Sequence, residues 1–155
     1  MDKNNSNLKG SGRREYRYHA VESNFLPFVL YVVNDDYHLL LVKKILDHIP
    51  EINFQHSASA KNAFSVALKD KPHLILIDLD MQATNGFELQ TLLREHPLTR
   101  KTPVFALSSS TFPHDQEKIR KAGFKRHIPK PIKVHEFFNS VNQELEDIYQ
   151  QSQLP

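Results

Sequence analysis

The feature that most constrains the fold is a regular alternation between short apolar runs and helical patterns. Apolar or alternating runs of strand length occupy residues 28–33, 52–56, 74–77, 104–107 and 126–128. Each is followed by apolar residues at helical spacing, in residues 39–49, 58–68, 87–94, 116–122 and 134–149. Strands that alternate with helices indicate a parallel sheet covered by helices on both faces. The nearly continuous apolar runs are typical of strands that are buried on both sides.

A chain of 155 residues has the size of one ordinary domain. We therefore expect a single α/β domain with a five-stranded parallel sheet, doubly wound in the flavodoxin-like manner, and five helices. The economical strand order for this arrangement is 2-1-3-4-5. The start of the chain lacks apolar periodicity, so we expect a flexible tail over residues 1–24, a domain over residues 25–150 and a short tail over residues 151–155.

Composition excludes several classes of function. The chain has no cysteine, which rules out disulfides, cysteine nucleophiles and thiolate metal sites. No apolar run approaches the roughly 18–20 residues of a membrane span, and no secretory signal is present, so we expect a cytoplasmic protein without a membrane partner. The net charge of +2 lies in residues 1–24, whereas residues 25–155 hold fifteen Lys/Arg and fifteen Asp/Glu. This neutral body gives no support to nucleic-acid binding.

Polar residues follow four of the five predicted strands. They are Asn34, Asp35 and Asp36 after the first strand, Asp78 and Asp80 after the third, Ser108, Ser109 and Ser110 after the fourth, and Lys130 after the fifth. Each alone is a common turn or capping residue, but the carboxyl ends of parallel strands meet in one crevice. Clustered carboxylates without histidine or cysteine suit Mg²⁺. Together with a hydroxyl and a lysine they suit an incoming phosphoryl group.

Five fragments of the chain, in this order, resemble the receiver domain of two-component response regulators, in the stand-alone form of the chemotaxis regulators. They are residues 32–36 (VVNDD), residues 76–81 (LIDLDM) with Asn85-Gly86, residues 103–108 (PVFALS), Ala122-Gly123 and Lys130-Pro131. The resemblance covers about residues 27–149. It implies a signalling domain, not an enzyme, that accepts a phosphoryl group from a sensor histidine kinase or a histidine phosphotransfer protein. It also implies output through a protein target on the face formed by residues 116–149.

The resemblance also assigns roles to residues. It makes Asp78 the phosphoryl acceptor and Ser108 and Lys130 the side chains that contact the phosphoryl group. Mg²⁺ would be held by Asp35, by Asp78 and by the backbone carbonyl of Asp80, with Asn34 acting through a water molecule. The Lys130-Pro131 bond is expected to be cis, which only an X-Pro bond allows cheaply. Gly86 and Gly123 fall at turns where a positive φ would suit glycine.

Three positions depart from the family pattern. Asn34 stands where the family has a first acid, which removes one negative charge from the metal site. Gln82 stands where a proline is common. His127 replaces the Tyr or Phe that moves inward when the Ser/Thr hydroxyl follows the phosphoryl group. We expect His127 either to act as this switch, in a pH-sensitive way because imidazole titrates near neutral pH, or to be an exposed residue that faces a partner.

Other functions stay open at this stage. Asn34 favours a receiver-like interaction module that does not depend on phosphorylation. A phosphohydrolase that forms an aspartyl phosphate would also use Asp78 and Asp80, but Gln82 stands where that class has threonine. A Ser-His-Asp hydrolase built from Ser108, His127 and Asp78 lacks the Gly-x-Ser-x-Gly turn. The chain is interpreted as a complete stand-alone receiver, with a fragment of a longer regulator or hybrid kinase as the alternative.

Overall fold

The computed structural model describes residues 25–81 and 85–154, and within them five strands alternate with five helices. In chain order the elements are β1 (Phe28–Val32), α2 (Asp36–Leu46), β2 (Asn53–Ser57), α3 (Ala60–Asp70), β3 (Leu74–Asp78), α4 (Gly86–Glu95), β4 (Val104–Ser108), α5 (Pro113–Lys121), β5 (Arg126–Pro129) and α6 (Val134–Ser152). The predicted tail over residues 1–24 and the departure at Gln82 lie outside the described residues. The predicted alternation is confirmed.

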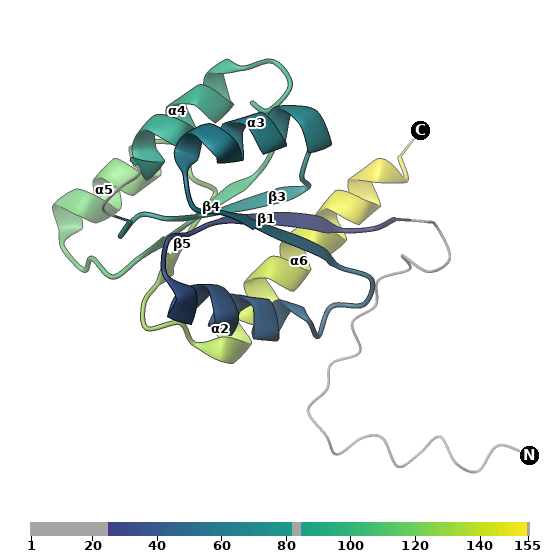
Figure 1. Ribbon diagram of the computed structural model, residues 1–155, viewed down its shortest axis with the longest axis horizontal. Helices are drawn as coiled ribbons and strands as arrows, with labels where there is room; N and C mark the ends of the chain where they lie inside the picture. Colours follow the sequence, from purple (N-terminus) through teal and green to yellow (C-terminus); the bar gives the residue numbers. More distant parts are fainter. Residues whose placement is uncertain (1–24, 82–84, 155) are drawn as a thin grey trace, which may run out of the picture.

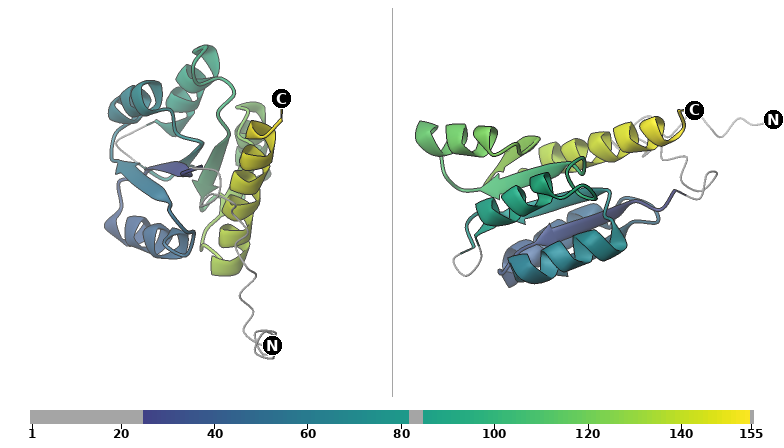
Figure 2. Two further views of the ribbon diagram at one scale, coloured as in Figure 1. Left: turned by 90° about the vertical axis from the view of Figure 1, so that its right-hand side faces the viewer. Right: turned by 90° about the horizontal axis from the view of Figure 1, so that it is seen from above.

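The strands form one parallel sheet with the order β2-β1-β3-β4-β5, as predicted. Helices α3, α4 and α5 cover one face, and α2 and α6 cover the other (Figures 1 and 2). Successive side chains of a strand point to opposite faces, so β1 sends Val29 and Tyr31 toward α2 and α6, and Leu30 and Val32 toward α3 and α4. Both faces are covered, which is why β1, β3 and β4 are buried along their whole length.

Several helix ends differ from the predicted ends, because apolar spacing marks the buried face of a helix but not its termini. Helix α2 begins at Asp36 because the side chain of Asp35 caps it, and Ile49, the predicted last helical residue, is buried in the turn that follows. Helix α5 begins at Pro113, since proline suits the first position of a helix. Helix α6 continues to Ser152. Among the described helices, none is both long enough and apolar enough to cross a membrane.

The two glycines of the domain serve different purposes. Gly123 ends the α5 region with a φ of +86°, as predicted. The prediction of a positive φ at Gly86 is wrong, because Gly86 is the first residue of α4. A Cβ there would lie 2.7 Å from Leu79 Cδ2 and 2.8 Å from Ile77 Cγ2. Glycine is needed at this position because α4 lies so close to the end of β3.

Candidate functional site

The predicted site residues gather at the carboxyl edge of the sheet. A cavity of about 610 Å³ is lined by Asn34, Asp35, His38, Asp78, Asp80, Met81, Ser109, Lys130 and Pro131. The structure thus brings together all four predicted metal-binding residues and the predicted lysine. Ser108 does not line this cavity, although it is the last residue of β4, the strand that pairs with β3.

Lys130 and Asp78 form the centre of the site. The Lys130 Nζ lies 2.7 Å from Asp78 Oδ2 and 3.1 Å from Asp80 Oδ2. The side chains of Lys130 and Asp78 are only 7% and 3% exposed. The N–H of Lys130 donates to the carbonyl of Ser108 at 3.0 Å, which positions the Lys130 backbone next to the end of β4. The Lys130-Pro131 bond is cis, as expected. A buried ammonium therefore bridges two carboxylates that follow the same strand.

The side chain of Asp80 has a structural role that the sequence analysis missed, since it assigned only the backbone carbonyl. Asp80 Oδ2 accepts a hydrogen bond from the N–H of Ser109 at 3.0 Å, and the N–H of Asp80 donates to Asp78 Oδ1 at 2.8 Å. Burial alone would raise the pKa of Asp80, but the Lys130 ammonium and the Ser109 N–H outweigh burial and hold the pKa of this carboxyl below its usual range. Asp80 therefore joins the ends of β3, β4 and β5.

Asp35 and His38 form the wall of the cavity on the α2 side. Asp35 Oδ1 accepts a hydrogen bond from the N–H of His38 at 3.0 Å, and the His38 Nδ1 lies 3.3 Å from Asp35 Oδ2. The backbone hydrogen bond is the main reason why the pKa of Asp35 is lowered. The sequence analysis did not select His38. Its position three residues after a capping aspartate, on the first turn of a helix, is the signal that would have found it.

The pKa of Tyr31 on β1 is affected by the negative charges of the site. Its ring is fully buried in the middle of β1, and burial is the main reason why the pKa of its phenol is raised. The charges of Asp78, Asp35 and Asp80 raise this pKa further. The three carboxylates therefore act together as a centre of negative charge at this edge of the sheet.

A series of hydrogen bonds connects Ser108 to His127. The N–H of Ser110 donates to Ser108 Oγ at 3.1 Å, and Gln116 Nε2 donates to the carbonyl of Ser110 at 2.8 Å. Gln116 Oε1 then lies 2.8 Å from His127 Nδ1, and because this oxygen is an acceptor, Nδ1 carries the proton. The His127 ring is half-buried and lies next to α5, and the expectation that it faces a partner stays a prediction. Its action as a switch stays a prediction.

The donor atoms at this cavity fit a hard cation. Carboxylate, amide and backbone oxygens, which Mg²⁺ prefers, come from Asn34, Asp35, Asp78 and Asp80. Within residues 25–81 and 85–154, no three His, Asp or Glu side chains are arranged as a preformed metal site. Lys130 Nζ contacts Asp78 Oδ2 and Asp80 Oδ2, so a cation at these residues would share the two carboxylates with Lys130.

Comparison with known proteins gives relatives of the same kind. A family model described as the response regulator receiver domain matches residues 29–142. The hybrid signal transduction histidine kinase D of Dictyostelium discoideum is 34% identical over 92 residues, which are 57% of this chain and 6% of the kinase. The polar-differentiation response regulator DivK of Brucella anthropi is 32% identical over 85 residues, which are 55% of this chain and 69% of DivK. The chain thus spans a small part of the kinase and about two thirds of DivK.

Solved structures share the fold. The chemotaxis response regulator CheY4 of Vibrio cholerae superposes with a TM-score of 0.70 at 20% identity, covering 77% of this chain and 99% of CheY4. The receiver domain of the sensor histidine kinase PA1611 of Pseudomonas aeruginosa, described with a magnesium ion coordinated in its active-site cleft, superposes with a TM-score of 0.67 at 20% identity. That alignment covers 76% of this chain and 94% of the PA1611 domain.

The matched range of the family model includes β1 from Val29 onward, the four other strands, and both Asp78 and Lys130. The strand order agrees with the fold of the solved receiver structures. The chain belongs to the response regulator receiver domain family of two-component signalling proteins.

Proposed function

We propose that this chain accepts a phosphoryl group on Asp78 from the phosphohistidine of a sensor histidine kinase or a histidine phosphotransfer protein. The observation that carries the proposal is the buried contact of 2.7 Å between Lys130 Nζ and Asp78 Oδ2, in a cavity that Asp35 and Asp80 also line. A buried carboxylate next to an ammonium is positioned to act as a nucleophile while the ammonium neutralises the oxygens of the incoming group.

The transfer forms one bond and breaks one. A carboxylate oxygen of Asp78 attacks phosphorus, and the P–N bond to the donor imidazole breaks. The imidazole leaves with the electron pair of that bond and takes up a proton, and Asp78 becomes an acyl phosphate. Lys130 transfers its contact from the carboxylate to the phosphoryl oxygens. Phosphoryl transfer depends mainly on such positioning and charge neutralisation.

Mg²⁺ is the cofactor that we assign to this site. Asp35, Asp78 and the backbone carbonyl of Asp80 would hold the ion, with Asn34 acting through a water molecule. The bound ion would neutralise charge on the phosphoryl oxygens. His38 limits the freedom of Asp35, because its N–H donates to Asp35 Oδ1 and its ring lies 3.3 Å from Asp35 Oδ2.

The proposed output runs from Ser108 to the face formed by α5, β5 and α6. The Ser108 hydroxyl would donate to the phosphoryl group and draw the loop after β4 toward Asp78. That loop includes Ser110, whose carbonyl accepts from Gln116 on α5. Gln116 in turn holds His127 on β5. A shift of Ser108 would therefore be transmitted to α5 and β5, where a protein target would detect it.

Intact mass measurement after incubation with acetyl phosphate or phosphoramidate and Mg²⁺ tests the acceptor. The wild-type protein should gain the mass of one phosphoryl group, and Asp78→Asn should gain none. The matched control is Asp36→Asn, because Asp36 is exposed on α2 and does not line the cavity; this variant should label like wild type. Equal labelling of wild type and Asp78→Asn would overturn the proposal.

A second candidate function is an interaction module that works without phosphorylation. Two observations favour it: Asn34 stands where an acid would add negative charge to the cavity, and Lys130 already offsets one of the two charges of Asp78 and Asp80. A target protein that binds wild type and Asp78→Asn equally, with and without acetyl phosphate, would support this function.

A further inference from the structure

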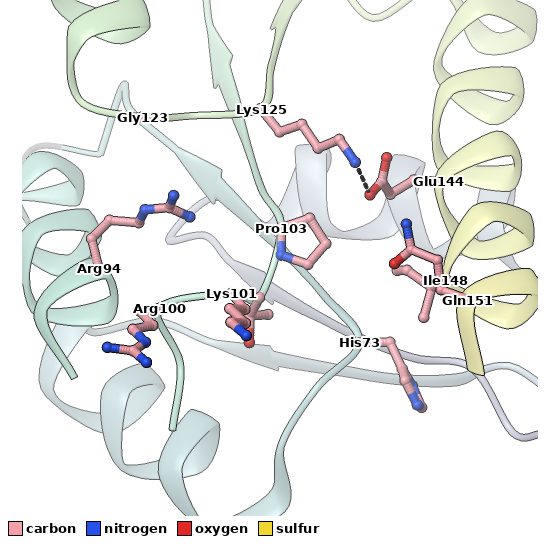
Figure 3. A pocket seen from close by; sticks show the side chains of 11 residues that line it. His73, Arg94, Arg100, Lys101, Pro103, Gly123, Lys125, Glu144, Ile148 and Gln151 are labelled. Carbon is pink, nitrogen blue, oxygen red and sulfur yellow. Dashed lines mark hydrogen bonds and ion pairs between the residues drawn. The ribbon is translucent and has the colours of Figure 1, made fainter. Parts of the chain in front are cut away.

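A second cavity opens at the opposite edge of the sheet, where β3, β4 and β5 begin (Figure 3). Its volume is about 620 Å³. The segments before these strands contribute His73, Lys101, Pro103 and Lys125 to its lining, and α4 and α6 close it from two sides. In Figure 3, Arg94 and Arg100 lie on one side, the α6 residues lie on the other, and Pro103 lies between them.

Positive charge dominates this cavity. Four cationic side chains line it: Arg94, Arg100, Lys101 and Lys125. The single lining carboxylate, Glu144, is buried and lies 2.6 Å from Lys125 Nζ (Figure 3). Among the described residues, no carboxylate contacts Arg94, Arg100 or Lys101. Three positive charges are therefore left uncompensated in a domain whose total numbers of acidic and basic residues are equal.

The shape of the cavity points to a small ligand. A volume of several hundred Å³ is in the range of small-molecule sites, roughly 300–1,000 Å³. Pro103 and Ile148 add apolar surface to the lining of the cavity. Gly123 lies next to Arg94 in this lining, and a Cβ at Gly123 would make only an ordinary contact of 3.5 Å with Arg94 Nε. The planar guanidinium groups of arginine match phosphate oxygens in geometry and in charge.

We propose that this cavity binds the diphosphate group of a small molecule, either a nucleoside diphosphate or inorganic pyrophosphate. The number of charges is the reason for a diphosphate. One phosphate group carries about −1.5 to −2 charges near neutral pH, so two linked groups are needed to balance the three uncompensated cations. The site is independent of Asp78, because it lies at the other edge of the sheet and shares no lining residue with the carboxyl-edge cavity.

The test is a titration of the full chain, followed by NMR and calorimetry, with inorganic pyrophosphate, ADP and adenosine as separate probes. Divalent cations are removed and ionic strength is held constant. Pyrophosphate and ADP should bind saturably and shift the amide signals of residues 101–103 and 123–125, while adenosine alone should not bind. ADP that binds more tightly than pyrophosphate would identify a nucleotide ligand, and equal affinities would identify an inorganic one; both outcomes support the proposal.

Charge-removing variants locate the site. Arg94→Gln and Lys101→Gln should each weaken pyrophosphate binding by about tenfold, the value of one charge-assisted hydrogen bond. The matched control is Lys61→Gln, which removes the same charge from an exposed position on α3 outside the cavity and should bind like wild type. Thermal unfolding of each variant verifies that the fold is intact.

Three results would overturn the proposal. The first is an absence of saturable binding by either phosphate probe. The second is an equal loss of affinity in Lys61→Gln and Arg94→Gln, which would indicate attraction to overall charge alone. The third is that an oligoglutamate peptide binds, and this binding is weakened by Arg94→Gln, whereas pyrophosphate does not bind. This result would assign the cavity to an acidic protein segment. Labelling of Asp78 by acetyl phosphate does not depend on any of these results.

Discussion

The two edges of the sheet carry cavities of nearly equal volume and opposite charge. At the carboxyl edge, about 610 Å³ are lined by three carboxylates and one buried lysine, Lys130. At the amino edge, about 620 Å³ are lined by four cations and one buried carboxylate, Glu144. At each edge, one buried side chain has the opposite charge to the other charged side chains: Lys130 among the carboxylates, and Glu144 among the cations. One parallel sheet carries two separate cavities, and the residues next to the strand ends decide the charge of each.

Burial differs between the two central ion pairs. Both carboxylates, Asp78 and Glu144, are 3% exposed, but Lys130 is 7% exposed whereas Lys125 is 51% exposed. Water therefore screens the amino-edge pair far more than the carboxyl-edge pair. The carboxyl-edge pair is therefore enclosed on both sides, whereas the amino-edge pair is open to solvent on the side of the lysine.

The largest expected effect comes from removing the two lysines in turn. Lys130→Met should lower the free energy of unfolding by about 3 kcal/mol, because it leaves buried Asp78 without its partner. Lys125→Met should lower it by about 1 kcal/mol, because solvent already screens that pair. Urea unfolding at neutral pH without divalent cations measures both. Equal losses would show that the difference in burial has no energetic consequence.

The two glycines provide the next comparison. Gly86→Ala at the carboxyl edge should cost about 2 kcal/mol, because the new Cβ would overlap Leu79 and Ile77. Gly123→Ala at the amino edge should cost about 1 kcal/mol, because its φ of +86° is strained for alanine although the space is open. Urea unfolding measures the losses. If Gly123→Ala loses more unfolding free energy than Gly86→Ala, α4 can move away from β3 to make room for the new Cβ at position 86.

Restoring the missing acid tests the negative charge of the carboxyl edge. Asn34→Asp should tighten Mg²⁺ binding by about 5- to 30-fold, corresponding to roughly 1–2 kcal/mol for a charge that acts partly through water. Isothermal titration of Mg²⁺ measures the change. The control is Asn139→Asp, which adds the same charge at an exposed position on α6. If Asn34→Asp binds Mg²⁺ with the affinity of wild type, Asn34 lies too far from the ion to affect its binding.

The smallest expected effect concerns His73 at the amino edge. Its Nδ1 accepts a hydrogen bond from the N–H of Phe28 at 2.9 Å, and burial lowers its pKa below the ordinary value of 6.5. The unfolded chain therefore takes up a proton before the folded protein does, so the stability from neutral His73 is complete above pH 6.5 and is lost as pH falls below it.

The dependence of the unfolding free energy on pH, between about pH 5 and 7, measures this contribution. His73→Gln should show a smaller decrease toward acid than wild type. His56→Gln, which removes an exposed imidazole from β2, is the control. If His73→Gln and wild type lose stability in parallel, His73 does not contribute to acid sensitivity.

Part of the carboxyl-edge site was predictable because it depends on strand ends. Asp78 and Lys130 were selected from their positions after two apolar runs, and the structure places them 2.7 Å apart. The side-chain role of Asp80 was not predictable, since it depends on the N–H of Ser109, 29 residues further along the chain. His38 was not predicted because it lies in the first turn of α2. The start of α2 is set by the cap at Asp35, which apolar spacing does not show.

The sequence by itself determined the alternation of strands and helices, the family, and the edge at which the acids gather. These follow from local apolar patterns and from the rule that parallel strands end on one side. Only the tertiary structure decided that Lys130 bridges two acids, that His127 is held by Gln116, and that Arg94, Lys101 and Lys125 share a cavity. These contacts join residues from separate elements, and their geometry depends on how the helices pack across the sheet, which no local pattern encodes.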